Sequence, residues 1–178
     1  MLDYDPYAAL AALRDFPPLT LTSDDLENGQ PLKKEQWDAA MGGRDISPQL
    51  SWSGAPAETR SFSVSIFDPD APTGSGFWHW AVFNIPATVT SLARGAGAAQ
   101  GGNLPEGSVT LPNENRLTSY SGSAPPPGTG THRYFIVVNA LDVPTLDIPA
   151  DATPAILGFN NHFHSLARGI LVGTASSD

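Results

Sequence analysis

The segment Asp68–Trp80, DPDAPTGSGFWHW, is the stretch on which both the fold and the candidate site depend. Alternating residues 61–67 (SFSVSIF) precede it and apolar residues 80–85 (WAVFNI) follow it, which predicts two strands joined by a Gly- and Pro-rich loop. If these strands pair as a hairpin, the end of the first and the start of the second lie at one edge of the sheet. The stretch therefore predicts that the carboxylate of Asp68 and the imidazole of His79 lie at the opening of the same pocket.

Length, charge and cysteine content limit the class of protein. The chain has 178 residues, which favours a single domain over residues 1–178. It has no cysteine, and this excludes disulfides, thiolate metal sites and a catalytic thiol. A net charge of −9 argues against nucleic acid as a partner. The N-terminal segment has early acidic residues and no long apolar run, so we expect no membrane segment and a cytoplasmic location.

The pattern of strands and turns predicts a β-dominated α+β fold. Gly and Pro, at 17 each, suit a chain with many turns. Residues 132–141 (HRYFIVVNAL) are apolar on both faces, which predicts a central strand. Residues 87–112 are expected to be mostly loop, and no G-x-G-x-x-G follows a strand. Further strands are predicted at 19–22, 47–52, 108–111 and 168–173, and helices within 1–16, 33–40 and 154–167.

A second imidazole is predicted at the same edge of the sheet. If the strand 132–141 runs parallel to 80–85, His132 starts at the edge where His79 lies, and Tyr134 faces the same side as His132. Imidazole and phenol groups can donate hydrogen bonds to a small anion, and a nearby carboxylate favours the protonated imidazole. The backbone N–H groups of residues 121–123 are a candidate nest for phosphate. These groups together predict a pocket for a small anion.

Several other interpretations stay open. His79 could be a satisfied core histidine, and Asp68 could merely cap a turn. Asp68, His79 and His132 could together bind zinc, whereas His162 and His164, two residues apart on a predicted helix, face different directions and make a poor metal pair. An enzyme that uses the pocket for acid–base chemistry is an alternative, although no G-x-S-x-G motif indicates a serine hydrolase.

Four motifs carry a resemblance to a known family. They are SPQLSW at 47–52, DPDAP at 68–72, WHW at 78–80 and GSAPPPGTGTHRY at 122–134. In these motifs the chain resembles the phosphatidylethanolamine-binding proteins (PEBP), in particular the bacterial Raf-kinase-inhibitor-like branch. The DPYAAL start and the LGFN segment at 157–160 are similar to actinobacterial members.

The resemblance implies a fold, a pocket and partners. The fold is a large antiparallel sheet packed between a smaller sheet and helices. The ligand is a small anion or a phosphate-bearing phospholipid head group, with no cofactor and no metal. The resemblance also implies a homodimer, a kinase or protease as protein partner, and a cis peptide bond at Ala71–Pro72. The implied ligand-binding residues are Asp68, Pro72, His79, Tyr120, Gly122, His132 and Tyr134.

The chain departs from the family pattern at a few positions. Ala124 stands where the family usually has Gly, Phe77 where it has Trp, and Asp45 where it has Asn. No C-terminal helix is evident after Val172, so we expect a more open mouth. An alkylammonium group is expected to lie near Phe77 and Trp78. A pure interaction module, which works through its loop surface rather than its pocket, is a further alternative.

Overall fold

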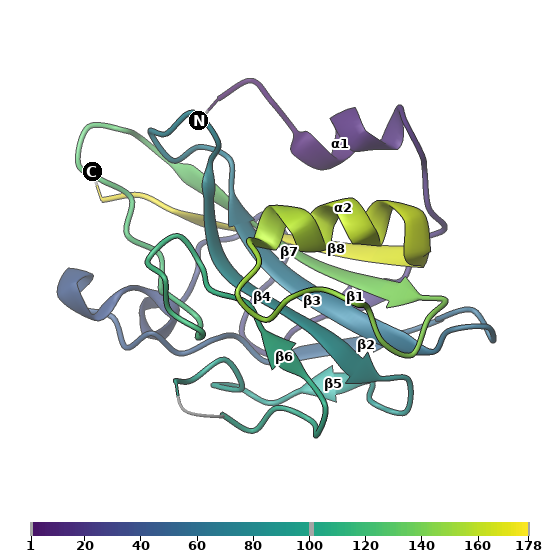
Figure 1. Cartoon of the computed structure of the whole chain (residues 1–178). Helices are drawn as coiled ribbons and strands as arrows, with labels where there is room; N and C mark the ends of the chain where they lie inside the picture. The colour runs from purple at the N-terminus through teal and green to yellow at the C-terminus, as the bar shows by residue number, and fades with distance from the viewer. Residues whose placement is uncertain (1, 100–101, 178) are drawn as a thin grey trace.

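The computed structural model describes residues 2–99 and 102–177, and it has three layers (Figure 1). A five-stranded antiparallel sheet, in the order β6-β4-β3-β7-β8, lies between a three-stranded sheet, β1-β2-β5, and two helices. This arrangement confirms the predicted fold class. The elements are α1 (Pro6–Ala11), β1 (Thr20–Thr22), η1 (Lys34–Gln36), η2 (Ala39–Met41), β2 (Leu50–Ser53), β3 (Ser61–Asp68), β4 (Phe77–Pro86), β5 (Ser91–Leu92), β6 (Val109–Thr110), β7 (His132–Leu141), α2 (Pro154–His164) and β8 (Ser165–Ala175).

Strand β3 is the centre of the large sheet. It pairs antiparallel with β4 on one side and with β7 on the other, so β4 and β7 run in the same direction. This relation places the starts of β4 and β7 beside the end of β3, as the sequence predicted. Successive side chains of β3 alternate between the faces, and nearly all of them are buried because both faces are covered.

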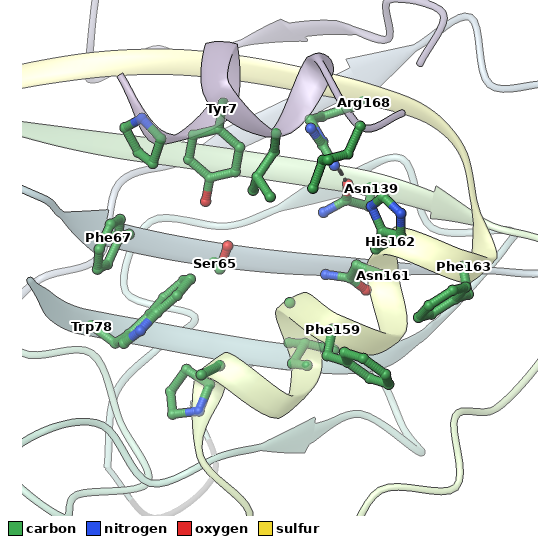
Figure 2. Close-up of a pocket in the computed structure, with 17 residues that line it drawn as sticks. Tyr7, Ser65, Phe67, Trp78, Asn139, Phe159, Asn161, His162, Phe163 and Arg168 are labelled. Carbon is green, nitrogen blue, oxygen red and sulfur yellow. Dashed lines mark hydrogen bonds between the residues drawn. The ribbon is translucent and has the colours of Figure 1, made fainter. Parts of the chain in front are cut away.

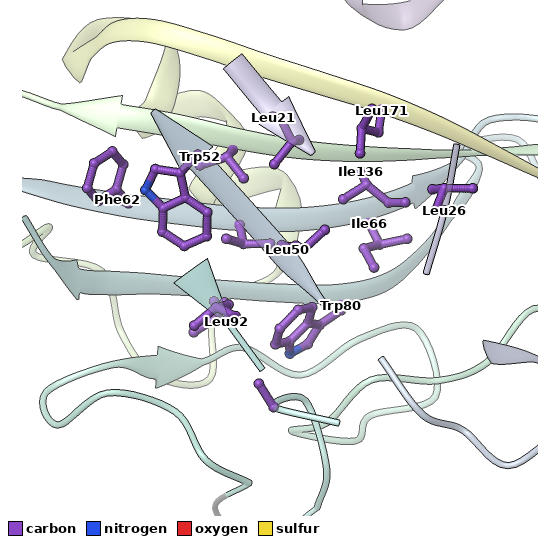
Figure 3. Close-up of a cluster of buried hydrophobic side chains, with 14 of the residues drawn as sticks. Leu21, Leu26, Leu50, Trp52, Phe62, Ile66, Trp80, Leu92, Ile136 and Leu171 are labelled. Carbon is purple, nitrogen blue, oxygen red and sulfur yellow. The ribbon is translucent and has the colours of Figure 1, made fainter. Parts of the chain in front are cut away.

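The face of β3 toward the small sheet is apolar. Phe62 and Ile66 join a core that also contains Trp52, Trp80 and Ile136 (Figure 3). The rings of Trp52 and Phe62 lie 5.3 Å apart at a tilt of 58°. This core fills the space between the two sheets, and it removes large apolar side chains from water.

The opposite face of β3 is lined by serines, which explains the alternating pattern of the strand. Ser61 donates to the carbonyl of Val143 at 2.6 Å, and Ser63 donates to Asn161 of α2 at 3.1 Å. A second, smaller apolar cluster, which includes Phe83 and Leu157, packs the rest of α2 against the sheet. Among the described residues, no helix is long and apolar enough to cross a membrane.

Several predicted elements differ from the structure in their bounds, and one strand was missed. Strand β4 begins at Phe77 rather than at residue 80, because Phe77 and Trp78 already pair with the end of β3. Helix α2 ends at His164 because residues 165–167 pair with β7 at the edge of the sheet. Strand β5 pairs with β2 inside the stretch predicted as mostly loop, of which residues 100–101 lie outside the described part.

Truncation of an isoleucine should destabilise the protein much more in the core between the sheets than on the surface. Ile136 is 1% exposed in the central core, whereas Ile156 on α2 is 45% exposed. We expect Ile136→Ala to lower the free energy of unfolding by about 2–5 kcal/mol because it leaves a cavity. The matched change Ile156→Ala should cost less than about 1 kcal/mol. Urea denaturation measures both, and equal losses would contradict this assignment of the core.

Candidate functional site

One end of the large sheet holds a cavity of about 260 Å³, here called the front cavity. It opens where β3 ends and where β4 and β7 begin, on the side of the small sheet. Six of the seven residues named from the sequence line it, and Tyr120 does not. The complete lining is Asp38, Asp68, Ala71, Pro72, Thr73, Phe77, His79, Asn115, Gly122, Ala124, Pro126, His132 and Tyr134.

Asp68 is the buried anchor of the front cavity. Its Oδ1 accepts the backbone N–H groups of Asp70 and Ala71, at 2.8 and 3.0 Å. Its Oδ2 lies 2.7 Å from Nδ1 of His132, and both side chains are almost fully buried. Asp68 therefore does two things at once, because it closes the turn after β3 and also fixes the ring of His132.

The second nitrogen of His132 is also occupied. Its Nε2 lies 2.8 Å from Oγ1 of Thr129, and that hydroxyl donates its own proton to the carbonyl of Pro126 at 2.6 Å. Nε2–H must therefore donate to Thr129, and one further proton lies between Nδ1 and Asp68. The pair of Asp68 and His132 is thus neutral as a unit. Because Nε2 has no lone pair to offer, this geometry does not support Thr129 as a nucleophile activated by His132.

His79 reaches the front cavity through a β-bulge. Phe67 pairs with Trp78 and Ile66 with Trp80, so His79 is the extra residue between two pairs. A bulge interrupts the alternation of side chains, and here His79 and Trp80 both lie on the side of the small sheet while Trp78 lies on the other. The bulge therefore aims His79 at the cavity.

Burial keeps His79 neutral. Its Nδ1–H donates to the carbonyl of Ser121 at 2.8 Å, because a carbonyl oxygen can only accept. Burial lowers the pKa of His79 below its ordinary 6.5, against the opposing influence of Ser121 and of the charge on Asp68. The neutral ring then carries its lone pair on Nε2. The histidine that Asp68 holds is His132, and burial outweighs the charge of Asp68 in its effect on the pKa of His79.

The two tyrosines occupy different environments. The hydroxyl of Tyr134 is buried and has no hydrogen-bond partner among the described residues, and Tyr134 is one of the residues that line the front cavity. Its ring meets His79 edge-on at 5.1 Å. By contrast, Tyr120 packs in the core between the sheets, and its hydroxyl donates to the carbonyl of Gln36 at 2.6 Å. Burial raises the pKa of both tyrosines, so each hydroxyl stays protonated.

Gly122 brings a distant segment to the front cavity. A Cβ there would lie 2.2 Å from backbone atoms of Trp37 and Asp38, so only glycine fits this close approach. The contact explains why Asp38 lines the cavity although no local pattern singles it out. Asp45, noted as a departure from the family pattern, accepts the N–H of Gly122 at 2.7 Å.

The predicted phosphate nest is absent at residues 121–123. Ser121 N–H donates to the carbonyl of His79, Ser123 N–H to that of Gln36, and the N–H of Gly122 is held by Asp45. Each of these donors already has a partner inside the protein, so none of them is free for an anion.

Two other expectations about the rim were wrong. Trp78 lies on the opposite face, with its ring 4.4 Å from that of Phe67, so only Phe77 of the aromatic pair walls the front cavity. No peptide bond between described residues is cis, and Ala71–Pro72 is trans. The turn there is closed by Thr73 N–H, which donates to the carbonyl of Ala71 at 2.7 Å.

The histidines of α2 do not belong to the front cavity. His164 pairs with Asp142 at 2.9 Å on the surface, whereas His162 lines a separate cavity on the helix side of the sheet. The prediction that they face different directions is confirmed. Among residues 2–99 and 102–177, no group of three or more His, Cys, Asp or Glu side chains is placed to hold a metal ion.

Comparisons with known proteins agree with this fold. The model of the phosphatidylethanolamine-binding protein family matches residues 22–176. The UPF0098 protein YbhB of Escherichia coli K12 is 45% identical over 160 residues, which cover 89% of this chain and 100% of YbhB. The crystal structure of E. coli YbcL, described as a new member of the mammalian PEBP family, superposes with a TM-score of 0.85 at 35% identity, over 90% of this chain and 99% of YbcL.

A third relative bears on cellular location. Mycobacterium tuberculosis LppC, whose name assigns it to the lipoproteins, is 34% identical over 136 residues, which cover 76% of this chain and 61% of LppC. The cytoplasmic location stays a prediction.

The buried and exposed Asp–His pairs of this chain allow a direct comparison. Asp68→Asn removes one charge from a pair that is 1% and 3% exposed, and we expect it to cost about 3–5 kcal/mol of unfolding free energy. Asp142→Asn breaks a similar contact with His164, which is 37% and 44% exposed, and should cost at most about 1 kcal/mol. Chemical denaturation measures both. If Asp68→Asn lowered the unfolding free energy no more than Asp142→Asn does, the structural role given to Asp68 would be wrong.

Proposed function

Because the chain belongs to the phosphatidylethanolamine-binding protein family, we propose that its front cavity binds a small ligand with an anionic head group, such as phosphoethanolamine. Membership of the family supports ligand binding at a general level. The observation that carries the proposal is Tyr134, a residue of the cavity lining whose buried hydroxyl has no partner among the described residues. A buried donor without a partner is costly, and a ligand oxygen would satisfy it.

The charges of the front cavity favour a zwitterion over a bare dianion. No Lys or Arg lines the cavity, and the Asp68–His132 pair is neutral as a unit. An anionic head group therefore gains a positive partner only when His79 takes up a proton on Nε2. Asp38, which lines the same cavity, is a carboxylate that an ammonium group of the ligand can meet.

The finer parts of this proposal rest on the sequence resemblance. They are a homodimer, a kinase or protease as protein partner, a cytoplasmic location, and closeness to the Raf-kinase-inhibitor-like and actinobacterial members. Each stays a prediction, and none of them is needed for the ligand site itself.

A matched pair of tyrosine variants tests the site. We expect Tyr134→Phe to lower the affinity for phosphoethanolamine about tenfold, because a hydrogen bond to a charged group is lost. Its stability should be unchanged or slightly raised, since the hydroxyl has no protein partner. Tyr120→Phe should cost about 1 kcal/mol of stability and leave the affinity unchanged. Isothermal titration and thermal unfolding give both quantities.

The histidines provide a second comparison in the same titration. His79→Ala and His132→Ala should both weaken binding, His79 by loss of its direct contact and His132 by release of Asp68. Equal affinity in these variants and in the parent protein would disprove the site assignment. If Tyr120→Phe alone weakened binding, the front cavity would not be the ligand site.

The state of His79 predicts the pH dependence of binding. The pKa of free His79 is below 6.5, and an anion on Nε2 raises it, so binding takes up a proton. Affinity should therefore increase as pH falls from about 8 toward about 6, by at most about tenfold per unit. Glycerophosphoethanolamine is a suitable ligand because the charge of its phosphodiester is constant over this range.

The variant His79→Gln tests whether the pH dependence of binding comes from His79 or from another titrating group of the front cavity. We expect its affinity to be lower than that of the parent protein and to lose the increase at low pH. An affinity that rises with pH in the parent protein, or an unchanged pH profile in His79→Gln, would contradict proton uptake by His79.

A further inference from the structure

A second cavity lies on the helix side of the large sheet, between the sheet, α1 and α2 (Figure 2). Its volume is about 450 Å³, larger than the front cavity and within the range of roughly 300–1,000 Å³ that ligand sites occupy. We call it the back cavity. Tyr7 of α1, Phe67 and Trp78 of the sheet, and Phe159 and Phe163 of α2 give it apolar walls.

The N-terminal segment that carries α1 is fixed to the rest of the protein by an arginine at each of its ends. Arg133, paired with Asp70, donates to the carbonyls of Leu2 and Tyr4 at 2.9 and 2.7 Å. At the other end Arg14 donates to the carbonyls of His162 and Phe163, at 2.7 and 2.9 Å. These contacts fix α1 against α2, so the cavity is formed before any ligand arrives. Helix α1 precedes the residues 22–176 that the family model covers.

Arg168 supplies a cation at the edge of the back cavity. Its Nε donates to Asn139 at 3.1 Å, and its guanidinium carbon lies 4.5 Å from the ring centre of Phe16 and 5.5 Å from that of Tyr7. Within the described residues Arg168 forms no ion pair, and Nη1 and Nη2 make no hydrogen bond. Burial lowers the pKa of Arg168, which reflects the cost of holding this charge away from water.

The sign of charge in the back cavity is opposite to that of the chain. The protein carries 18 Asp and Glu side chains and a net charge of −9, yet none of the acids in the described part of the chain lines the cavity. Among the described residues that line it, Arg168 and His162 are the only basic ones. Figure 2 shows both of them at the same side of the cavity as Asn139, with Phe159 and Phe163 below. One end of the cavity is therefore basic, and the rest is mostly apolar, with Ser65, Asn139 and Asn161 as polar residues of the lining.

We propose that the back cavity binds an amphiphile with a carboxylate head and an aliphatic tail. The two free guanidinium nitrogens of Arg168 can form paired hydrogen bonds to the two oxygens of a carboxylate. The tail lies along the apolar walls between α1 and α2. This site is separated from the front cavity by the large sheet, so the two ligands bind independently.

The test uses the full chain and three ten-carbon probes that differ only in the head group. Decanoate is anionic, decanol is neutral and decyltrimethylammonium is cationic. We expect decanoate to bind one per chain, about tenfold tighter than decanol, and the cationic probe to bind weakest. Saturating phosphoethanolamine should not displace decanoate. Equal binding of the three probes, or displacement by phosphoethanolamine, would overturn the proposal.

Two variants locate the probe. Arg168→Met keeps much of the packing against Phe16 but removes the charge, so decanoate should lose about tenfold in affinity while decanol is unaffected. Gly158→Phe adds an aromatic ring on α2, where a new Cβ meets no atom within 4 Å, and should block all three probes. Because Gly158 lies in a helix, this variant is expected to fold, which thermal unfolding checks.

Ile156→Phe is the matched control, since it adds a similar ring to an exposed position of α2 outside the cavity lining. It should leave decanoate binding unchanged. If Gly158→Phe retained decanoate binding, the proposal would be wrong. A second copy of the chain could instead occupy the cavity by binding the exposed rings of Phe159 and Phe163. Light scattering detects such a dimer. A dimer that Gly158→Phe dissociates, with no probe bound to the parent protein, would also refute the ligand site.

Discussion

The hydrogen bond between Asp68 and His132 joins two strands whose residues are 64 positions apart in the sequence. It is buried, and each partner has its remaining polar atoms satisfied, Asp68 by the turn after β3 and His132 by Thr129. Because neither group can leave the pair without exposing an unsatisfied buried partner, the interaction fixes both loops that surround the front cavity. The turn that holds Ala71 beside Pro72 and the loop that carries Thr129 are tied to this pair.

The end of β3 also explains why two cavities lie back to back. Asp68 faces the small sheet and lines the front cavity, whereas Phe67 faces the helices and lines the back cavity. On β4 the bulge at His79 interrupts this alternation, so that His79 joins Asp68 while Trp78 joins Phe67. One sheet therefore separates a polar cavity, suited to a head group, from a largely apolar cavity with a single cation. The chemistry of each follows from which face a side chain occupies.

The local pattern was sufficient for much of the fold and for part of the site. Alternation at 61–67 and the apolar run 132–141 predicted the two central strands, and their ends predicted that Asp68, His79 and His132 meet. The pattern was insufficient for the end of α2, because the sheet edge at β7 captures residues 165–167. It also left open which histidine Asp68 binds, since that depends on how the strands are packed rather than on neighbours in the chain.

The sequence by itself determined the strands, the loop chemistry and the family motifs, because periodicity and special residues act over a few positions. The tertiary structure decided which of two tyrosines lines the front cavity, since packing gives the hydroxyl of Tyr120 a partner in Gln36 and leaves that of Tyr134 without one among the described residues. It decided that Asp38 approaches Gly122 and that α1 closes the back cavity beside Arg168. These contacts join segments far apart in the chain, and their geometry depends on register and packing, which no local pattern contains.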